Sequence, residues 1–132
     1  MKMNPVVHFE MPADNKKRMA DFYTRAFGWK TQMLGPEMGE YVLATTCDSD
    51  ENGTPKKGGM INGGFYQKTA DAMSNSPSVV IAVTDIAESM KLVKDAGGKI
   101  LNEPMQIPGV GSYVSFLDTE GNRVGMLQPL PM

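Results

Sequence analysis

Residues 78–98 read SVVIAVTDIAESMKLVKDAGG, and this stretch decides the fold. It begins with a nearly continuous run of β-branched residues (VVIAV), which is typical of a strand buried on both faces. Asp85 stands three residues before Glu88, a helix-start pattern, because a carboxylate accepts hydrogen bonds from the first free backbone N–H groups. Gly97 and Gly98 predict the end of this helix, because glycine adopts the left-handed conformation without a Cβ penalty.

The same order of elements occurs near the N-terminus, in residues 6–28 (VVHFEMPADNKKRMADFYTRAFG). A strand at 6–11 precedes an amphipathic helix from about residue 15 to residue 27, and Gly28 ends it. The basic residues of this helix are expected on its solvated side. Further strand-like segments follow each copy. They lie at 29–34, 41–46 and 60–66 after the first helix, and at 99–102, 113–117 and 123–128 after the second, with a loop at 103–111.

This internal repetition predicts an α+β protein made of two βαβββ modules. The modules would form a cup-shaped, eight-stranded mixed sheet with the helices outside. Module 1 is expected at about 4–66 and module 2 at about 78–128, with a linker at 67–77. All of this fits within a single domain.

The composition excludes several classes of protein. At 132 residues the chain fits one domain with its own core. Its net charge of −2 gives no electrostatic case for nucleic acid or an anionic membrane as a partner. No apolar run approaches the ~20 residues that span a bilayer, and the N-terminus lacks the apolar segment of a signal peptide. Cys47 is the single cysteine, which excludes an internal disulfide and favours a reducing, cytoplasmic location.

Three stretches together resemble the vicinal oxygen chelate superfamily, which includes glyoxalase, bleomycin-resistance proteins and extradiol dioxygenases. They are FYTRAFGW at 22–29, VVIAVTDIAESMKLVKDAGGKI at 79–100 and SFLDTEGNRVGMLQP at 115–129. The resemblance covers nearly the whole chain. It implies paired βαβββ modules, a cup-shaped site in the cleft between them, and a homodimer.

The resemblance also implies where a metal would be bound, on the first and last strands of each module. His8 matches the first of these positions, and the matching position in module 2 is Ser78. The last position, four residues after the turn glycine and usually a glutamate, is Gly125. The fourth strand of module 1 should supply an acidic ligand, but residues 58–68 contain no Asp, Glu or His. The candidates on that strand are Asn62 and Gly63.

A divalent metal needs several convergent imidazole or carboxylate ligands. His8 is the single histidine of the chain, and Glu10 is the one acidic residue expected on the same face of its strand. Two such ligands are too few for tight binding, so no metal or other cofactor is expected. The alternative is a divalent metal held by an atypical set of ligands.

His8 and Glu10 are the candidate catalytic residues. His8 has three open interpretations: an acid–base or hydrogen-bonding group at the site, a remnant ligand without a present role, or a core histidine bonded to a backbone carbonyl. Glu10 could orient His8, bind a substrate cation, or lie at the rim of the site.

The residues expected to line a ligand pocket come from both modules. Asn62 and Ser78 could donate hydrogen bonds where metal ligands would otherwise stand. Phe65 and Tyr113 could stack on a flat ligand, although aromatic residues on strands are also common in cores. The complete predicted pocket comprises His8, Asn62, Phe65, Ser78, Tyr113 and Gly125.

These observations predict a metal-free, glyoxalase- or bleomycin-resistance-like protein that binds a small apolar or aromatic molecule between its modules. The alternative is a lyase, isomerase or dioxygenase-type enzyme that uses an atypical metal site or His8 as its acid–base group. An interaction protein, in which the fold serves dimerisation or partner binding, is a third possibility. The fold by itself does not choose among them.

Overall fold

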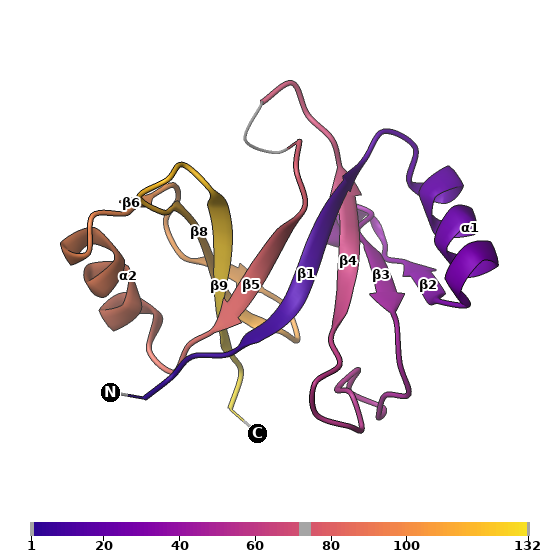
Figure 1. The fold of residues 1–132 in the computed structure, drawn as a ribbon, viewed down its shortest axis with the longest axis horizontal. Coiled ribbons are helices and arrows are strands. Elements are labelled where there is room, and N and C mark those ends of the chain that lie inside the picture. Colours follow the sequence, from indigo (N-terminus) through magenta and orange to yellow (C-terminus); the bar gives the residue numbers. More distant parts are fainter. Residues whose placement is uncertain (1, 72–74, 132) are drawn as a thin grey trace. The chain divides into compact units, whose positions relative to one another are not determined.

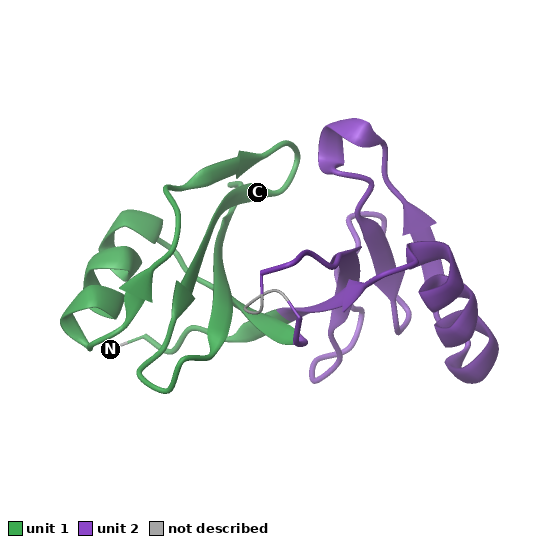
Figure 2. Ribbon diagram, turned by 90° about the horizontal axis from the view of Figure 1, so that it is seen from above, with its two compact units in different colours: residues 1–7, 78–132 green, residues 8–77 purple. Residues whose placement is uncertain are grey.

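The computed structural model describes residues 2–71 and 75–131, arranged in two compact units (Figures 1 and 2). We call residues 8–77 the N-module, and residues 1–7 together with 78–132 the C-module. The C-module resumes at Ser78. Part of the expected linker, residues 72–74, lies outside the described residues.

The N-module contains one helix and a four-stranded mixed sheet in the order β2-β3-β4-β1. The first two residues of strand β1 belong to the C-module, and its other residues belong to the N-module. Strand β1 pairs in parallel with β4. Strand β3 pairs antiparallel with both β4 and β2. The elements are β1 Val6–Ala13, α1 Lys16–Phe27, β2 Lys30–Met33, the 3-10 helix η1 Pro36–Met38, β3 Val42–Thr45 and β4 Asn62–Gln67.

The C-module repeats this plan with one strand added. Its sheet has the order β5-β9-β8-β6, with β5 and β9 parallel, and the extra strand β7 pairs antiparallel with β8. The elements are β5 Ser78–Ala82, α2 Ile86–Asp95, β6 Lys99–Ile100, β7 Met105–Ile107, β8 Gly111–Leu117 and β9 Arg123–Pro129. The expected α+β class with a mixed sheet is therefore confirmed.

The described residues form nine strands rather than the expected eight, because β7 lies inside the segment 103–111 that was expected to be a loop. Pro104 and Pro108 flank this strand, and their presence suggested a loop. Proline cannot donate to a sheet, but it is tolerated at a strand end. The three residues between the prolines pair with the start of β8, with Ile107 opposite Gly111.

Both helices begin and end as the sequence predicts. Asn15 precedes α1, and its side-chain oxygen accepts a hydrogen bond from the Arg18 backbone N–H at 2.9 Å. Asp85 does the same for α2, at 3.1 Å from the Glu88 N–H. Gly28 ends α1 with a φ of 73°, in the left-handed region.

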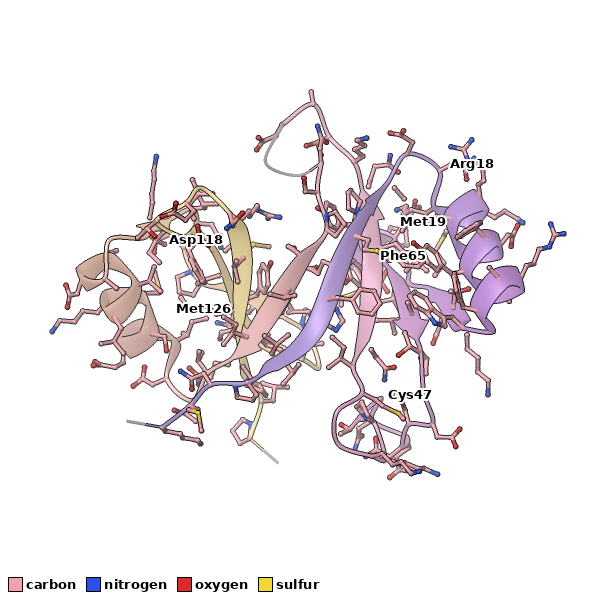
Figure 3. The ribbon with its side chains drawn as sticks, in the orientation of Figure 1. Arg18, Met19, Cys47, Phe65, Asp118 and Met126 are labelled. Atoms are coloured by element: carbon pink, nitrogen blue, oxygen red, sulfur yellow. The ribbon has the colours of Figure 1, made fainter. Side chains whose placement is uncertain are left out.

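Each helix packs on one face of the sheet of its own module. In the N-module, Phe65 lies at the centre of a cluster with Val42 and Ala44, and Met19 of α1 packs against it (Figure 3). In the C-module, Met126 occupies the corresponding place beneath α2 (Figure 3). The face of each sheet opposite its helix is therefore the one left for functional side chains. No helix in the described part of the chain is long and apolar enough to cross a bilayer.

Phe65→Ala should lower the free energy of unfolding by about 3–5 kcal/mol, because it removes a fully buried ring and leaves a cavity. Phe22→Ala is the matched control, since its ring is 56% exposed whereas that of Phe65 is 0% exposed; about 0.5 kcal/mol or less is expected there. Urea denaturation measures both. Equal losses for the two variants would contradict this assignment of the core.

Candidate functional site

The face of the N-module sheet opposite α1, which we call the polar face, carries the candidate site. Side chains alternate along β1, so His8 and Glu10 lie on this face while Phe9 and Met11 pack toward α1. The parallel pairing of β1 with β4 sets His8 beside Asn62 and Glu10 beside Gly64. The register of the fourth strand, which the sequence left open, is thereby fixed.

A tyrosine hydroxyl connects the two candidate catalytic residues. His8 Nε2 lies 3.0 Å from Tyr41 Oη, and Tyr41 Oη donates a hydrogen bond to Glu10 Oε2 at 3.2 Å. Alternate residues of a strand are about 6.6 Å apart, so one oxygen between them can reach both side chains. His8, Tyr41 and Glu10 thus form a continuous hydrogen-bonded chain across the polar face.

The ring of Tyr41 lies over a glycine of β4. A Cβ atom added at Gly64 would overlap with Cε2, Cζ and Oη of Tyr41. Any larger residue at position 64 would therefore displace the ring and its hydroxyl. The absence of a side chain at Gly64 is what allows Tyr41 to reach His8 and Glu10.

Burial lowers the pKa of His8 below its ordinary value, and the nearby charge of Glu10 opposes this by a smaller amount. Taking an imidazole out of water disfavours its charged form. His8 is therefore a neutral imidazole at neutral pH, able to act both as donor and as acceptor.

The C-module contains the same packing of a tyrosine on a glycine. Leu43 pairs with Gly64 between β3 and β4, and Ser115 pairs with Gly125 between β8 and β9. Tyr41 stands two residues before Leu43, and Tyr113 stands two residues before Ser115. A Cβ at Gly125 would lie 2.5 Å from Oη of Tyr113, just as one at Gly64 would meet Tyr41.

Ser78 lies at the start of β5, on the same face of the C-module sheet as Gly125. It is two residues from Val80, which pairs directly with Gly125. Ser78, Gly125 and Tyr113 are therefore brought to one face of this module, the face opposite α2.

A divalent metal does not fit the side chains at the positions that the resemblance implies. By the repeat, the fourth-strand position of the N-module that matches Gly125 is Gly64, and neither glycine offers a ligand atom. The tyrosine rings occupy the volume that a carboxylate would need at each of these positions. In the described part of the chain no three side chains of His, Cys, Asp or Glu come together.

Asn62 holds a loop of its own module. Its carbonyl oxygen accepts from the Thr46 N–H at 2.8 Å. Its amide donates to Ser49 Oγ at 2.8 Å and to the Gly53 carbonyl at 3.0 Å. These contacts tie residues 46–53 to the start of β4 beside His8, so the polar groups of Asn62 serve this loop.

Phe65, one of the predicted pocket residues, lies on the opposite face from His8. It is fully buried in the core beneath α1, because it is an odd number of residues from Asn62 and Gly64 along β4. Of the two roles that the sequence allows for Phe65, stacking on a ligand or packing in the core, the structure shows the core.

Tyr41 is the site residue that sequence reasoning missed. It precedes β3, and the sequence pattern indicates only the first residue of a strand at this position. The signal that could have found it is the internal repeat, which aligns Tyr41 with Tyr113 and Gly64 with Gly125.

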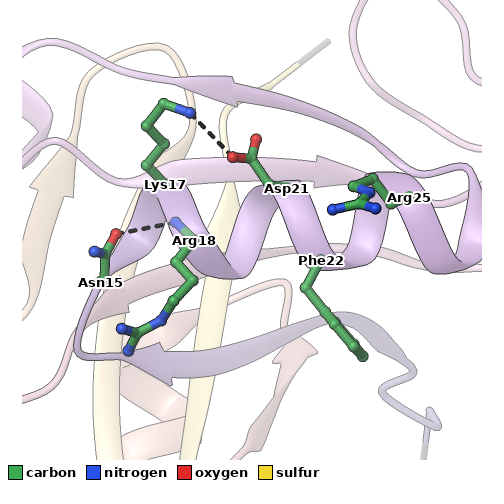
Figure 4. Close-up of a pocket in the computed structure, with 6 residues that line it drawn as sticks. All are labelled: Asn15, Lys17, Arg18, Asp21, Phe22 and Arg25. Carbon is green, nitrogen blue, oxygen red and sulfur yellow. Dashed lines mark hydrogen bonds and ion pairs between the residues drawn. The ribbon is translucent and has the colours of Figure 1, made fainter.

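A shallow depression on the solvent side of α1 is lined by polar and basic side chains (Figure 4). Within it Lys17 pairs with Asp21 at 3.0 Å, one helical turn apart, and Asn15 caps the helix. Lys17, Arg18 and Arg25 are exposed, as expected for basic residues on the solvated side of this helix. The lining residues are Asn15, Lys17, Arg18, Asp21, Phe22 and Arg25.

Comparison with known proteins identifies the class. Residues 6–126 match the family described as the Glyoxalase/Bleomycin resistance protein/Dioxygenase superfamily, and the chain belongs to this family. It is 31% identical over 120 residues to a glyoxylase-like domain-containing protein of Didymella fabae, covering 86% of this chain and 84% of that protein.

Solved structures share the fold at much lower identity. A hypothetical protein from Bacillus halodurans C-125 superposes with a TM-score of 0.69 at 15% identity, over 99% of this chain and 98% of the other. Methylmalonyl-CoA epimerase, solved with methylmalonyl-CoA and NH4+, gives a TM-score of 0.70 at 13% identity, over 98% of this chain and 96% of that one. These likenesses show the fold alone.

His8→Gln should make the protein less sensitive to acid. Because the pKa of His8 is lowered in the fold, the unfolded chain binds more protons below about pH 6.5, and stability is lost as the pH falls. Glutamine takes up no proton. Between about pH 7.5 and pH 5 the wild type should therefore lose more unfolding free energy than the variant, by at most about 1.4 kcal/mol per pH unit.

Urea denaturation at several pH values measures this difference. Asp118 does not interfere with this comparison. Hydrogen bonds from the Asn122 side chain and from nearby backbone N–H groups lower the pKa of Asp118 below its ordinary 3.8, so this carboxyl titrates below the pH range of the experiment. Parallel loss of stability in wild type and His8→Gln would show that His8 keeps its ordinary pKa in the folded protein.

Proposed function

We propose that this protein binds a small apolar or aromatic molecule on the polar face of the N-module, without a divalent metal. The observation that carries the proposal is the hydrogen-bonded chain of His8, Tyr41 and Glu10, at the strand position where the superfamily resemblance implies a metal ligand. A neutral imidazole is a polar group of the kind that orients a small molecule in its binding site, and Tyr41 holds it in place.

Several features support a metal-independent site. His8 Nε2 is engaged with Tyr41, so this nitrogen cannot coordinate an ion without breaking that hydrogen bond. The glycines at the last-strand positions provide no second or third ligand, and a structural zinc or a catalytic iron needs at least three. The ligand is therefore held by hydrogen bonds and apolar contacts.

An enzyme that transfers protons is the second candidate. It is favoured by the neutral state of His8, because an unprotonated imidazole near its substrate can act as a general base. A lyase or isomerase would fit this chemistry. The two candidates differ in the effect of His8→Gln. In a binding protein the substitution should weaken the affinity for the ligand. In an enzyme it should lower the turnover rate about 100-fold or more.

Purified, untagged protein should contain transition metal well below one equivalent. Ni²⁺, Zn²⁺, Mn²⁺ and Fe²⁺ should leave its thermal midpoint unchanged, because an ion raises stability only where it binds the folded state. Elemental analysis and a thermal-shift series measure the two quantities. Metal near one equivalent that is lost in His8→Ala would overturn the metal-independent site and favour a metalloenzyme.

A compound found by thermal-shift screening of small aromatic and apolar molecules should bind about 3- to 10-fold more weakly to His8→Ala and to Tyr41→Phe, the loss expected for one hydrogen bond. Titration calorimetry measures the affinities. Tyr23→Phe is the matched control, since its ring packs on Trp29 on the α1 side of the sheet. Unchanged affinity in both site variants would place the ligand elsewhere.

A further inference from the structure

The hydrogen bonds around Tyr41 determine which nitrogen of His8 carries its proton. A phenol has a single O–H, and an ionised carboxylate can only accept. Tyr41 Oη donates to Glu10 Oε2, so the proton of the phenol is directed away from His8. Toward His8 Nε2, 3.0 Å away, the phenol oxygen must therefore accept, and Nε2 must be the N–H donor.

The other nitrogen of the ring is then the acceptor. A neutral imidazole carries one N–H, so protonation at Nε2 leaves a lone pair on Nδ1. Within the described part of the chain, no group bonds to this Nδ1, and no side-chain nitrogen or oxygen is both buried and without a partner. The Nδ1 of His8 therefore reaches solvent.

We infer that Tyr41 and Glu10 are positioning residues that hold His8 as the Nε2–H tautomer, so that Nδ1 is the acceptor presented to the ligand. The ligand class that follows is a small molecule with a proton-donating group, such as a phenolic or enolic hydroxyl. The assignment of the ligand class rests on the proposed function, whereas the assignment of the tautomer stands without it.

Glu10 controls the direction of the whole chain of hydrogen bonds. With its carboxylate in place, the phenol proton points to Glu10. Without it, the same proton can point to His8 Nε2, which then becomes the acceptor and leaves the imidazole proton on Nδ1. Removing Glu10 should therefore shift the tautomer, because Glu10 accepts the hydrogen bond of Tyr41, whose hydroxyl lies beside His8 Nε2.

The chain has one histidine, so a long-range ¹H–¹⁵N correlation spectrum reports His8 without assignment. Above the pKa of His8, the wild type should show a protonated Nε2 and an unprotonated Nδ1. Glu10→Ala should lower the ratio of the Nε2–H to the Nδ1–H form about fivefold, the ratio that one net hydrogen bond supports. Tyr41→Phe should lose the protected Nε2–H proton signal. Tyr23→Phe should match the wild type.

A second pair of variants tests the same assignment without removing any hydrogen-bonding group. Gly64→Ala displaces the ring of Tyr41, whereas Gly125→Ala displaces that of Tyr113 in the C-module. Gly64→Ala should reproduce the spectrum of Tyr41→Phe, and Gly125→Ala should leave the His8 signals unchanged. An Nδ1–H tautomer in the wild type, or a wild-type ratio in Glu10→Ala, would overturn the assignment of Tyr41 and Glu10.

Phenol and anisole test the ligand class, because they differ in one proton-donating hydroxyl. Phenol should shift the Nδ1 resonance of His8, and anisole at the same concentration should not. Equal shifts from both, or none from phenol, would overturn the selection of a proton donor. The tautomer spectra are recorded without ligand, so failure of the proposed binding function is distinguishable from failure of the tautomer assignment.

Discussion

The parallel register of β1 against β4 is the constraint on which the rest of the N-module depends. It places Glu10 beside Gly64, so the space above this glycine, which the Tyr41 ring occupies, lies next to the Glu10 carboxylate. A shift of one residue would exchange the two faces of β1, moving His8 into the core and Phe9 to the polar face. The burial of Phe65 and Phe9 beneath α1 opposes such a shift. The hydrophobic core thereby fixes the geometry of the polar site on the other face.

The internal repeat shows which residues stand at the last-strand positions where the superfamily resemblance implies metal ligands. In each module the last strand has a glycine where a ligand could stand, and a tyrosine ring fills the vacated volume. The two substitutions depend on each other, because the ring requires the glycine and the glycine would leave a void without the ring. A carboxylate at Gly64 would need Tyr41 to move, and His8 would lose its partner. The glycine and the tyrosine of each module are therefore coupled in the structure.

Much of the fold could be predicted because its signals are local. Asp85 and Gly28 mark helix ends through hydrogen bonds within a few residues of the chain. The strand β7 was missed because its signal is not local: Met105–Ile107 is ordered by pairing with β8, which outweighs the flanking prolines. The site divides in the same way. Alternation placed His8 and Glu10 together, but the position of Tyr41 depends on pairings among β1, β4 and β3 that no single segment encodes.

A neutral histidine with a fixed tautomer differs physically from a metal as a recognition element. A divalent ion attracts any anionic or lone-pair donor, whereas Nδ1 of His8 accepts one hydrogen bond in one direction and repels anions that bring no proton. Glu10 adds negative charge behind Tyr41, which strengthens that preference. In the proposed function, this chain of three side chains selects proton donors, whereas a bound metal would select electron-pair donors. Gly64, a residue without a side chain, makes room for the Tyr41 ring on which this proposal depends.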